Sequence, residues 1–124
     1  MVGLLFNDSV RLFVERARRA ELVATGADRR VAFAVTRVIF GGLVESGYPV
    51  ALVAEAIGVC TDSVRARVQR GGSLRFSVVV SLAGSTREVV SAQLEPSAAD
   101  PLTGEPMYPA VAVIAWLARQ VPAI

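Results

Sequence analysis

The chain has 124 residues, the size of a single domain that can bury a core, and 53% of them are apolar. Its formal net charge of +2 excludes a polycation that would coat nucleic acid indiscriminately. The longest apolar run, Ala110–Ala118, is about half of the roughly 20 residues that a membrane-spanning helix needs, so we expect no membrane span. Asn7, Asp8 and Arg11 break the early apolar run of residues 2–6, so we expect no signal peptide either.

The residue types that are missing are also informative. All basic residues are arginine, which together with abundant alanine, valine and glycine indicates a GC-rich coding genome, such as that of an actinobacterium or one of its phages. The lone cysteine, Cys60, cannot form an internal disulfide, which indicates a cytoplasmic chain. Histidine, metal-spaced cysteines and phosphate-binding glycine loops are absent from the sequence. We therefore expect a protein that is not an enzyme and that holds no metal or cofactor.

A first helix is predicted from a cap at Asn7, Asp8 or Ser9 to about Thr25, with Gly26 as its stop. Its apolar residues recur on or near one face, at Val10, Phe13, Val14, Ala17 and Leu22.

A second helix is predicted over residues 27–46. Its inward positions are expected to be Val31, Val35, Val38, Ile39 and Leu43. The pair Gly41 and Gly42 weakens a helix by about 1 kcal/mol per residue relative to alanine, so we expect either a bend or a close helix contact there. Glu15, Glu21 and Glu55 are expected to be exposed helix residues rather than acid–base partners.

Residues 50–70, VALVAEAIGVCTDSVRARVQR, predict two short helices joined by a tight turn. The first helix would start after Pro49, end near Ile57 and bury Val53, Ala54 and Ile57 on one face. Gly58 would supply the break, because glycine enters the left-handed conformation without the cost that a Cβ imposes. A small residue such as Ala54 also lets two helices cross closely at a wide angle.

The second of these helices has its own signals. Thr61, Asp62 and Ser63 are candidates to cap it, since each can accept a hydrogen bond from a free amide of the first turn. Val64 and Val68, four residues apart, would give it a buried stripe.

With Ala54, Gly58, Val59 and Val64 in this order and VRARVQRG at its end, the segment resembles bacterial helix-turn-helix regulators and the promoter-reading fourth region of sigma factors. The resemblance implies that the second helix enters the major groove of double-stranded DNA and that its polar outward positions touch base edges and phosphates. The family pattern has a second buried position where this chain has Arg67, and Val68 follows one residue later.

Carried over one position at a time, the resemblance implies DNA contacts at Thr61, Asp62, Ser63, Arg65, Ala66, Gln69 and Arg70. A helical projection independently selects the outward positions Asp62, Ala66 and Gln69. Arg65 would fork onto a guanine, Gln69 would pair with an adenine and Arg70 would hold a phosphate. Eleven of the thirteen arginines precede residue 76, against seven of the eleven acids, so the positive charge accompanies this segment.

Residues 74–94 permit two interpretations. Residues 74–82 alternate apolar and polar side chains and are dense in β-branched residues, which predicts a strand. With a return strand over residues 87–94, they would form a hairpin wing that places Arg75 or Arg87 against DNA. The competing interpretation is a helix through Leu94 that begins at the capping box Ser85-Thr86-Arg87-Glu88.

The proline-rich residues 95–109 predict a linker to a last helix, with Pro109 at the first helical position. That helix is apolar nearly all round, at Val111, Ile114, Ala115, Trp116, Leu117, Ala118 and Val121. It must therefore pack either against its own domain or against a second subunit. A dimer would place two reading helices about 34 Å apart, over two half-sites.

The sequence thus predicts a mainly α fold. Residues 1–94 would form a helix-turn-helix domain with its motif at 50–70 and a wing at 74–94, and residues 95–124 would add the linker and a C-terminal packing or dimerisation helix. The expected function is sequence-specific DNA binding, as a small transcriptional repressor or other regulator that acts as a homodimer or higher oligomer. The alternative is a phage assembly or DNA-packaging component, resembling a small terminase subunit or a virion protein, that uses this fold in an oligomeric ring. A sigma-like factor without its other regions and a protein-binding module are further alternatives.

Overall fold

The computed structural model describes residues 7–120, except for the side chain of Ala56. The early apolar run of residues 2–6 and Val121 lie outside the described residues. The described chain is mainly helical, with seven helices and a small three-stranded antiparallel sheet. None of its helices has both the length and the apolar character that crossing a membrane would require.

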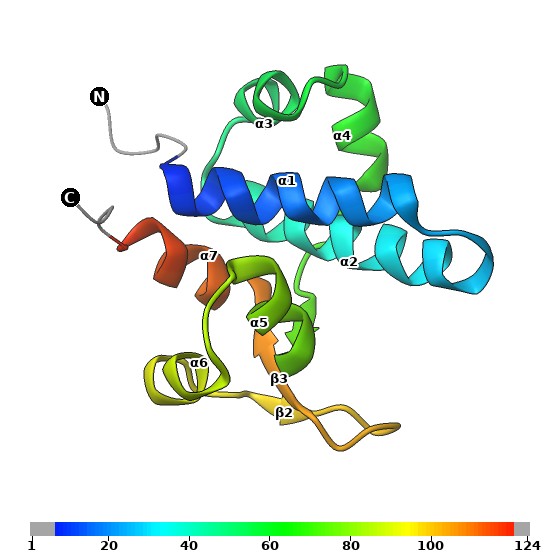
Figure 1. The fold of residues 1–124 in the computed structure, drawn as a ribbon. Coiled ribbons are helices and arrows are strands. Elements are labelled where there is room, and N and C mark those ends of the chain that lie inside the picture. The colour runs from blue at the N-terminus through cyan, green and yellow to red at the C-terminus, as the bar shows by residue number, and fades with distance from the viewer. Residues whose placement is uncertain (1–6, 121–124) are drawn as a thin grey trace.

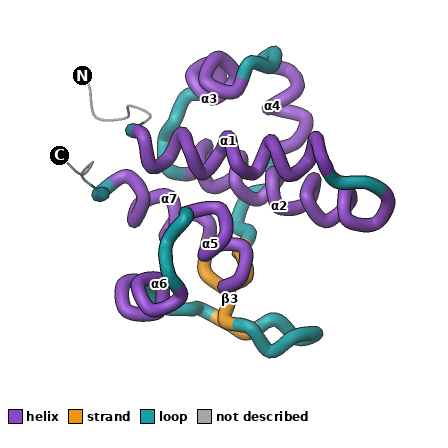
Figure 2. Tube along the Cα trace, in the orientation of Figure 1, coloured by secondary structure: helices purple, strands orange, loops and turns teal. Residues whose placement is uncertain are grey.

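Two long helices form the middle layer of the molecule, α1 (Asp8–Val23) and α2 (Gly26–Glu45). On one side of this pair lie the short helices α3 (Val50–Ile57) and α4 (Thr61–Arg67) (Figure 1). On the opposite side lie the remaining short elements, as Figure 2 also shows: β1 (Ser73–Arg75), α5 (Phe76–Ala83), α6 (Arg87–Gln93), β2 (Ala98–Ala99) and β3 (Pro106–Pro109). The last helix, α7 (Ala110–Ala118), packs against α2 and α1.

Helix α1 begins at the predicted cap. The Asn7 side chain accepts a hydrogen bond from the amide of Val10 at 2.8 Å, which satisfies one of the free donors of the first turn. The predicted inward residues of α2 are only partly correct, because Val31 is 49% exposed whereas Ile39 and Leu43 are fully buried. Leu22, near the end of α1 and on the other side of the α1–α2 turn from Val31, is 67% exposed. The α1–α2 turn projects beyond the elements that cover the rest of the pair (Figure 1), which fits the exposure of these two side chains.

The two adjacent glycines of α2 mark close contacts. A Cβ added to Gly41 would lie 1.8 Å from the carbonyl oxygen of Gln69, and one added to Gly42 would lie 2.8 Å from the Cβ of Ala110. The expected close helix contact is thus confirmed at Gly42, where α7 begins, and Gly41 lets the backbone that follows α4 approach α2.

Helices α3 and α4 are joined by the predicted turn. Gly58 adopts φ +73° at the end of α3, and the amide of Val59 donates to the carbonyl of Ala54 at 3.0 Å. Val53, Ala54 and Val64 are buried, as expected.

The predicted caps of α4 are wrong. Thr61, Asp62 and Ser63 form its first turn, and the cap residue is Cys60, which makes no side-chain capping hydrogen bond. The Cys60 carbonyl instead accepts from the amide of Ser63 at 3.1 Å. The helix ends at Arg67, so that Val68 lies in extended backbone just beyond it.

The predicted hairpin wing over residues 74–94 is wrong. Only Ser73–Arg75 forms a strand, and α5 and α6 follow it. Phe76, Val79 and Leu82 bury one face of α5 at a three-residue spacing, so tertiary packing overrides the β-branched composition. The competing helical interpretation is confirmed for α6, although Thr86 rather than Ser85 is the cap and accepts from the amide of Val89 at 3.2 Å.

Residues 95–109 are more than the expected linker. They contribute β2 and β3, and β3 pairs with both other strands in the order β1-β3-β2, with Leu74 opposite Tyr108 and Ala98 opposite Met107. Pro109 then caps α7 instead of occupying its first turn.

Helix α7 packs against its own chain, which is the first of the two expected arrangements. Val113, Ile114 and Leu117 are at most 1% exposed. The Asn7 side chain donates from Nδ2 to the carbonyl of Leu117 at 3.0 Å, and Trp116 donates to Gln93 at 2.7 Å. The two ends of the described chain are therefore tied together through Asn7, which also caps α1.

Candidate nucleic-acid interface

The outward face of α4 carries most of the predicted contact residues. Asp62, Ser63, Arg65 and Ala66 are exposed, Thr61 is half-buried, and Val64 faces the core with no exposed surface. In Figure 1, α3 is seen almost end-on and α4 from the side, so the two helices cross steeply and α4 stands at the surface of the molecule. The structure thus brings these five residues together on one short helix.

Arg65 has an acidic neighbour on the same helix. Its Nη1 lies 3.5 Å from Oδ1 of Asp62, and the two side chains are 65% and 93% exposed. An exposed pair at this spacing contributes well under 1 kcal/mol. The Arg65 guanidinium can therefore exchange Asp62 for another anionic or accepting group at small cost.

Gln69 and Arg70 lie beyond the end of α4. The amide of Gln69 donates to the carbonyl of Arg37 at 3.1 Å, and the amide of Gly71 donates to Glu45 at 2.7 Å. A helical projection that runs through residue 69 is therefore wrong for Gln69, although its side chain is exposed.

Arg70 nevertheless lies near Arg65. Both line one shallow depression of about 360 Å³, whose apolar floor is made by Val44, Val50 and Val68. Arg65 on α4 and Arg70 in the segment after it thus lie on one surface.

Arg75 does not join this surface. It lies in β1, on the opposite side of the α1–α2 pair from α4 (Figure 1). Hydrogen bonding from Ser77 lowers the pKa of Glu105, and the positive charge of Arg75 lowers it further. Arg87, the other predicted wing residue, lies on α6 with its Cζ 4.7 Å from the centre of the Phe76 ring. Without a hairpin wing, neither arginine is placed beside α4.

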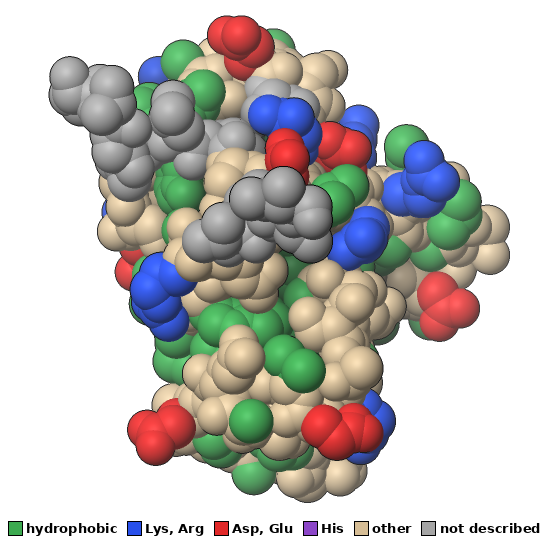
Figure 3. Space-filling model, turned by 60° about the vertical axis from the view of Figure 1, so that its left-hand side comes forward, with side chains coloured by type: hydrophobic (Ala, Val, Ile, Leu, Met, Phe, Trp, Pro, Cys, Tyr) green, Lys and Arg blue, Asp and Glu red, His purple; other side chains and the backbone are tan. Residues whose placement is uncertain are grey.

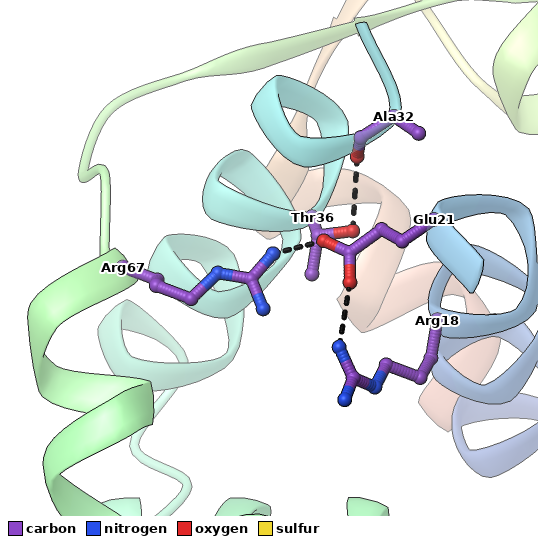
Figure 4. A network of polar contacts seen from close by, with 5 residues as sticks. All are labelled: Arg18, Glu21, Ala32, Thr36 and Arg67. Carbon is purple, nitrogen blue, oxygen red and sulfur yellow. Dashed lines mark hydrogen bonds and ion pairs between the residues drawn. The ribbon is translucent and has the colours of Figure 1, made fainter. Parts of the chain in front are cut away.

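A buried ion pair that the sequence did not predict fixes α4. Glu21 was expected to be exposed, but its side chain is buried, with 1% exposure. It accepts hydrogen bonds from both Arg67 and Arg18 (Figure 4). The Arg67 guanidinium also lies 4.6 Å from the ring centre of Phe33 and 5.4 Å from that of Phe40. Arg67 thus fills the expected buried position of α4 with a cation, and a carboxylate from α1 neutralises it.

A sequence signal for this pair exists. Val10, Val14, Ala17 and Glu21 follow one another at three- and four-residue spacing, so Glu21 continues the buried stripe of α1. Arg67 likewise occupies the position of α4 at which the family pattern has a buried residue. Two opposite charges on two buried stripes predict a pair, because a buried charge is stable only when it is matched.

Cys60 lies at the start of α4 and is exposed. Its Sγ is 3.1 Å from the hydroxyl oxygen of Ser63. Hydrogen bonding from Ser63 lowers the pKa of the Cys60 thiol, because it favours the thiolate.

The charge is distributed unevenly over the surface. On the face in Figure 3, arginines are most numerous in the upper half, at the level of α1 to α4, with some acidic side chains among them. The lower half, at the level of α5, α6 and the sheet, shows mainly apolar and neutral atoms. On this face, most of the arginines therefore lie on the side of the molecule that carries α4.

Comparisons with protein-family models, with curated proteins and with solved structures found no significant match.

Proposed function

We propose that α3 and α4 form a helix-turn-helix that binds specific sequences of double-stranded DNA, and that the protein acts in the cytoplasm as a small transcriptional repressor. The observation that carries the proposal is the outward face of α4. Asp62, Ser63 and Arg65 are exposed there while Val64 anchors the helix in the core. An α-helix fits the major groove, where each base pair presents a distinct pattern of donors and acceptors.

The chemistry of the exposed residues supports specific contacts. Arg65 can donate two hydrogen bonds to the O6 and N7 atoms of a guanine, and Asp62 can accept one from the amino group of a cytosine. Arg70, beside Arg65, can hold a phosphate. Gln69 supplies an exposed amide at the end of the helix, where it can pair with an adenine.

The length of α4 limits what one copy can read. Its seven residues span about 10 Å, which corresponds to about three base pairs. So short a site has little specificity by itself. We therefore propose that two copies bind two half-sites separated by about one turn of the duplex.

The test is a selection from a pool of random duplexes, with sequencing of the bound fraction. The wild type should enrich a short motif that contains guanine. Arg65→Ala should lose about 1–3 kcal/mol of discrimination at one position, roughly 5- to 150-fold. Arg119→Ala is the matched control, because it removes one exposed arginine at the end of α7 and should leave the motif unchanged.

Absence of any enriched motif for the wild type would overturn the proposal. A closed ring of subunits in sedimentation analysis, together with such an absence, would favour the assembly alternative instead.

A further inference from the structure

A second basic surface lies on α2. Gly26, Arg29, Arg30, Phe33, Ala34 and Arg37 line a shallow depression of about 470 Å³, and no acidic residue lines it. Positions 26, 29, 33 and 37 follow one another at three- or four-residue spacing, and positions 30 and 34 form a second such row beside them, so that all six share one face of the helix. Asp28 lines a different depression, with Val31 and Val35, on another side of α2. We call Arg29, Arg30, Phe33 and Arg37 the α2 arginine face.

The charges of this face are not neutralised within the described chain. Arg29, Arg30 and Arg37 are exposed, and no ion pair within 4.0 Å joins any of them to a carboxylate of residues 7–120. Glu21 is already paired with Arg18 and Arg67, so that even this buried cluster keeps an excess positive charge.

The aromatic ring of this face lies close to two guanidinium groups. The guanidinium of Arg67 lies 4.6 Å from the ring centre of Phe33, and that of Arg29 lies 5.5 Å from it. A ring quadrupole orients such cations but does not cancel their charge. In addition, Arg29 and Arg30 lie near the N-terminus of α2, where the helix dipole disfavours cations. The arrangement therefore favours the binding of an anion on this face.

The α2 arginine face is continuous with α4. Arg67, the last residue of α4, contacts Phe33, and the amide of Gln69 donates to the carbonyl of Arg37. Arg30 and Arg37 are seven residues apart, about 10 Å along the helix. Since phosphates repeat every 3.4 Å of rise on each strand, the face spans the phosphates of about three base pairs. Guanidinium forks match phosphate oxygens bidentately.

We propose that the α2 arginine face binds phosphates of the DNA backbone beside the bases that α4 reads. This inference rests on the proposed function. Arg29, Arg30 and Arg37 would hold the duplex against α2 and α4 whatever its base sequence. The residues of α4 would discriminate between base sequences.

The experiment compares Arg30→Ala/Arg37→Ala with the wild type by fluorescence anisotropy over a salt series, on the selected duplex and on an unrelated duplex. Each lost phosphate contact lowers the slope of log K against log salt concentration by about 0.9, so the double variant should lose about 1.8. Its affinity for the two duplexes should fall by the same factor, which leaves the preference intact. Arg30→Lys/Arg37→Lys should keep most of the slope, because it keeps both charges.

The matched control is Arg87→Ala/Arg119→Ala, which removes the same charge on the other side of the molecule and on α7. A salt slope for Arg30→Ala/Arg37→Ala equal to that of this control would overturn the inference, as would wild-type binding to anionic lipid vesicles in preference to DNA. If the wild type prefers the selected duplex and Arg65→Ala removes that preference while the slope of Arg30→Ala/Arg37→Ala is unchanged, only the inference fails. If the wild type binds no duplex, the proposed function fails as well.

Discussion

The contact between Glu21 and Arg67 should be the energetic link between α4 and the α1–α2 pair. Replacing Arg67 by methionine keeps much of its apolar stem but removes a charge-assisted hydrogen bond to a carboxylate that is 1% exposed. Such a bond contributes about 1.5–3 kcal/mol. Loss of the contacts with Phe33 and Phe40 adds about 1 kcal/mol. Arg18 still pairs with Glu21, and Arg67 is 18% exposed, so the total should lie at the low end of the roughly 3–5 kcal/mol that an unpaired buried charge costs.

We therefore expect Arg67→Met to lower the free energy of unfolding by about 3 kcal/mol, a large part of the roughly 5–15 kcal/mol of a typical domain. Urea denaturation followed by circular dichroism measures it, provided that the m-value is unchanged. Glu21→Gln should also destabilise the protein, because it leaves Arg67 beside a neutral amide. The double variant should be more stable than the sum of the two losses predicts, by about 1–2 kcal/mol.

Two results would refute this reasoning. One is a change of less than about 0.5 kcal/mol for Arg67→Met, which is the size of an ordinary surface substitution. The other is strict additivity of the two substitutions, which would mean that the two side chains do not interact.

Three further predictions concern single positions. Gly41→Ala should lower the free energy of unfolding in urea by more than about 2 kcal/mol, because its Cβ would lie 1.8 Å from the backbone oxygen of Gln69. Ala34→Gly, on the exposed face of α2, should lower it by about 1 kcal/mol. A loss for Gly41→Ala no larger than that of Ala34→Gly would contradict the close contact. Asn7→Ala should lose both the cap of α1 and the hydrogen bond to α7, which should lower the stability measured by thermal unfolding by about 1–2 kcal/mol. Asn7→Asp should keep the cap and lose only the hydrogen bond to α7. Equal losses of stability for the two variants would show that the cap contributes nothing. The pH midpoint for alkylation of Cys60 should lie below that of an ordinary thiol and should rise in Ser63→Ala, because the hydrogen bond from Ser63 lowers the pKa of the thiol. A midpoint that Ser63→Ala leaves unchanged would show that Ser63 does not lower this pKa.

Local signals predicted the elements that depend on local chemistry. The cap at Asn7 and the left-handed Gly58 follow from backbone groups that only such residues can satisfy. The buried positions Val53 and Val64 follow from helical spacing. In the same way, helical spacing predicts which residues of α4 are exposed.

The contacts that join distant segments could not be predicted in this way. The residues of α5 fit an alternating strand as well as a helix, and what decides between them is packing against α1 and the sheet. The partner of β1 is β3, more than 30 residues later. Glu21 and Arg67 are also distant in sequence, and neither shows its partner when its own segment is considered alone.

The candidate site shows the same division. Arg65 and its neighbours on α4 were predicted correctly as an exposed group, because one helix carries them. The prediction is wrong for Gln69, which lies beyond the end of α4, and for Arg75, because the predicted wing does not form. The α2 arginine face could not be predicted from the sequence, because its continuity with α4 depends on the contacts of Arg67 and Gln69 with α2.

The central claim, that α4 reads DNA, is tested most directly by the ratio of affinities for the selected duplex and for a duplex with the same composition in scrambled order, measured by anisotropy at one salt concentration. The claim predicts a ratio of at least about 1000 for the wild type, as specific binding requires. It also predicts a fall of about 5- to 150-fold for Arg65→Ala and no change for Arg119→Ala. A wild-type ratio near 1, or a ratio that Arg65→Ala leaves unchanged, would contradict it.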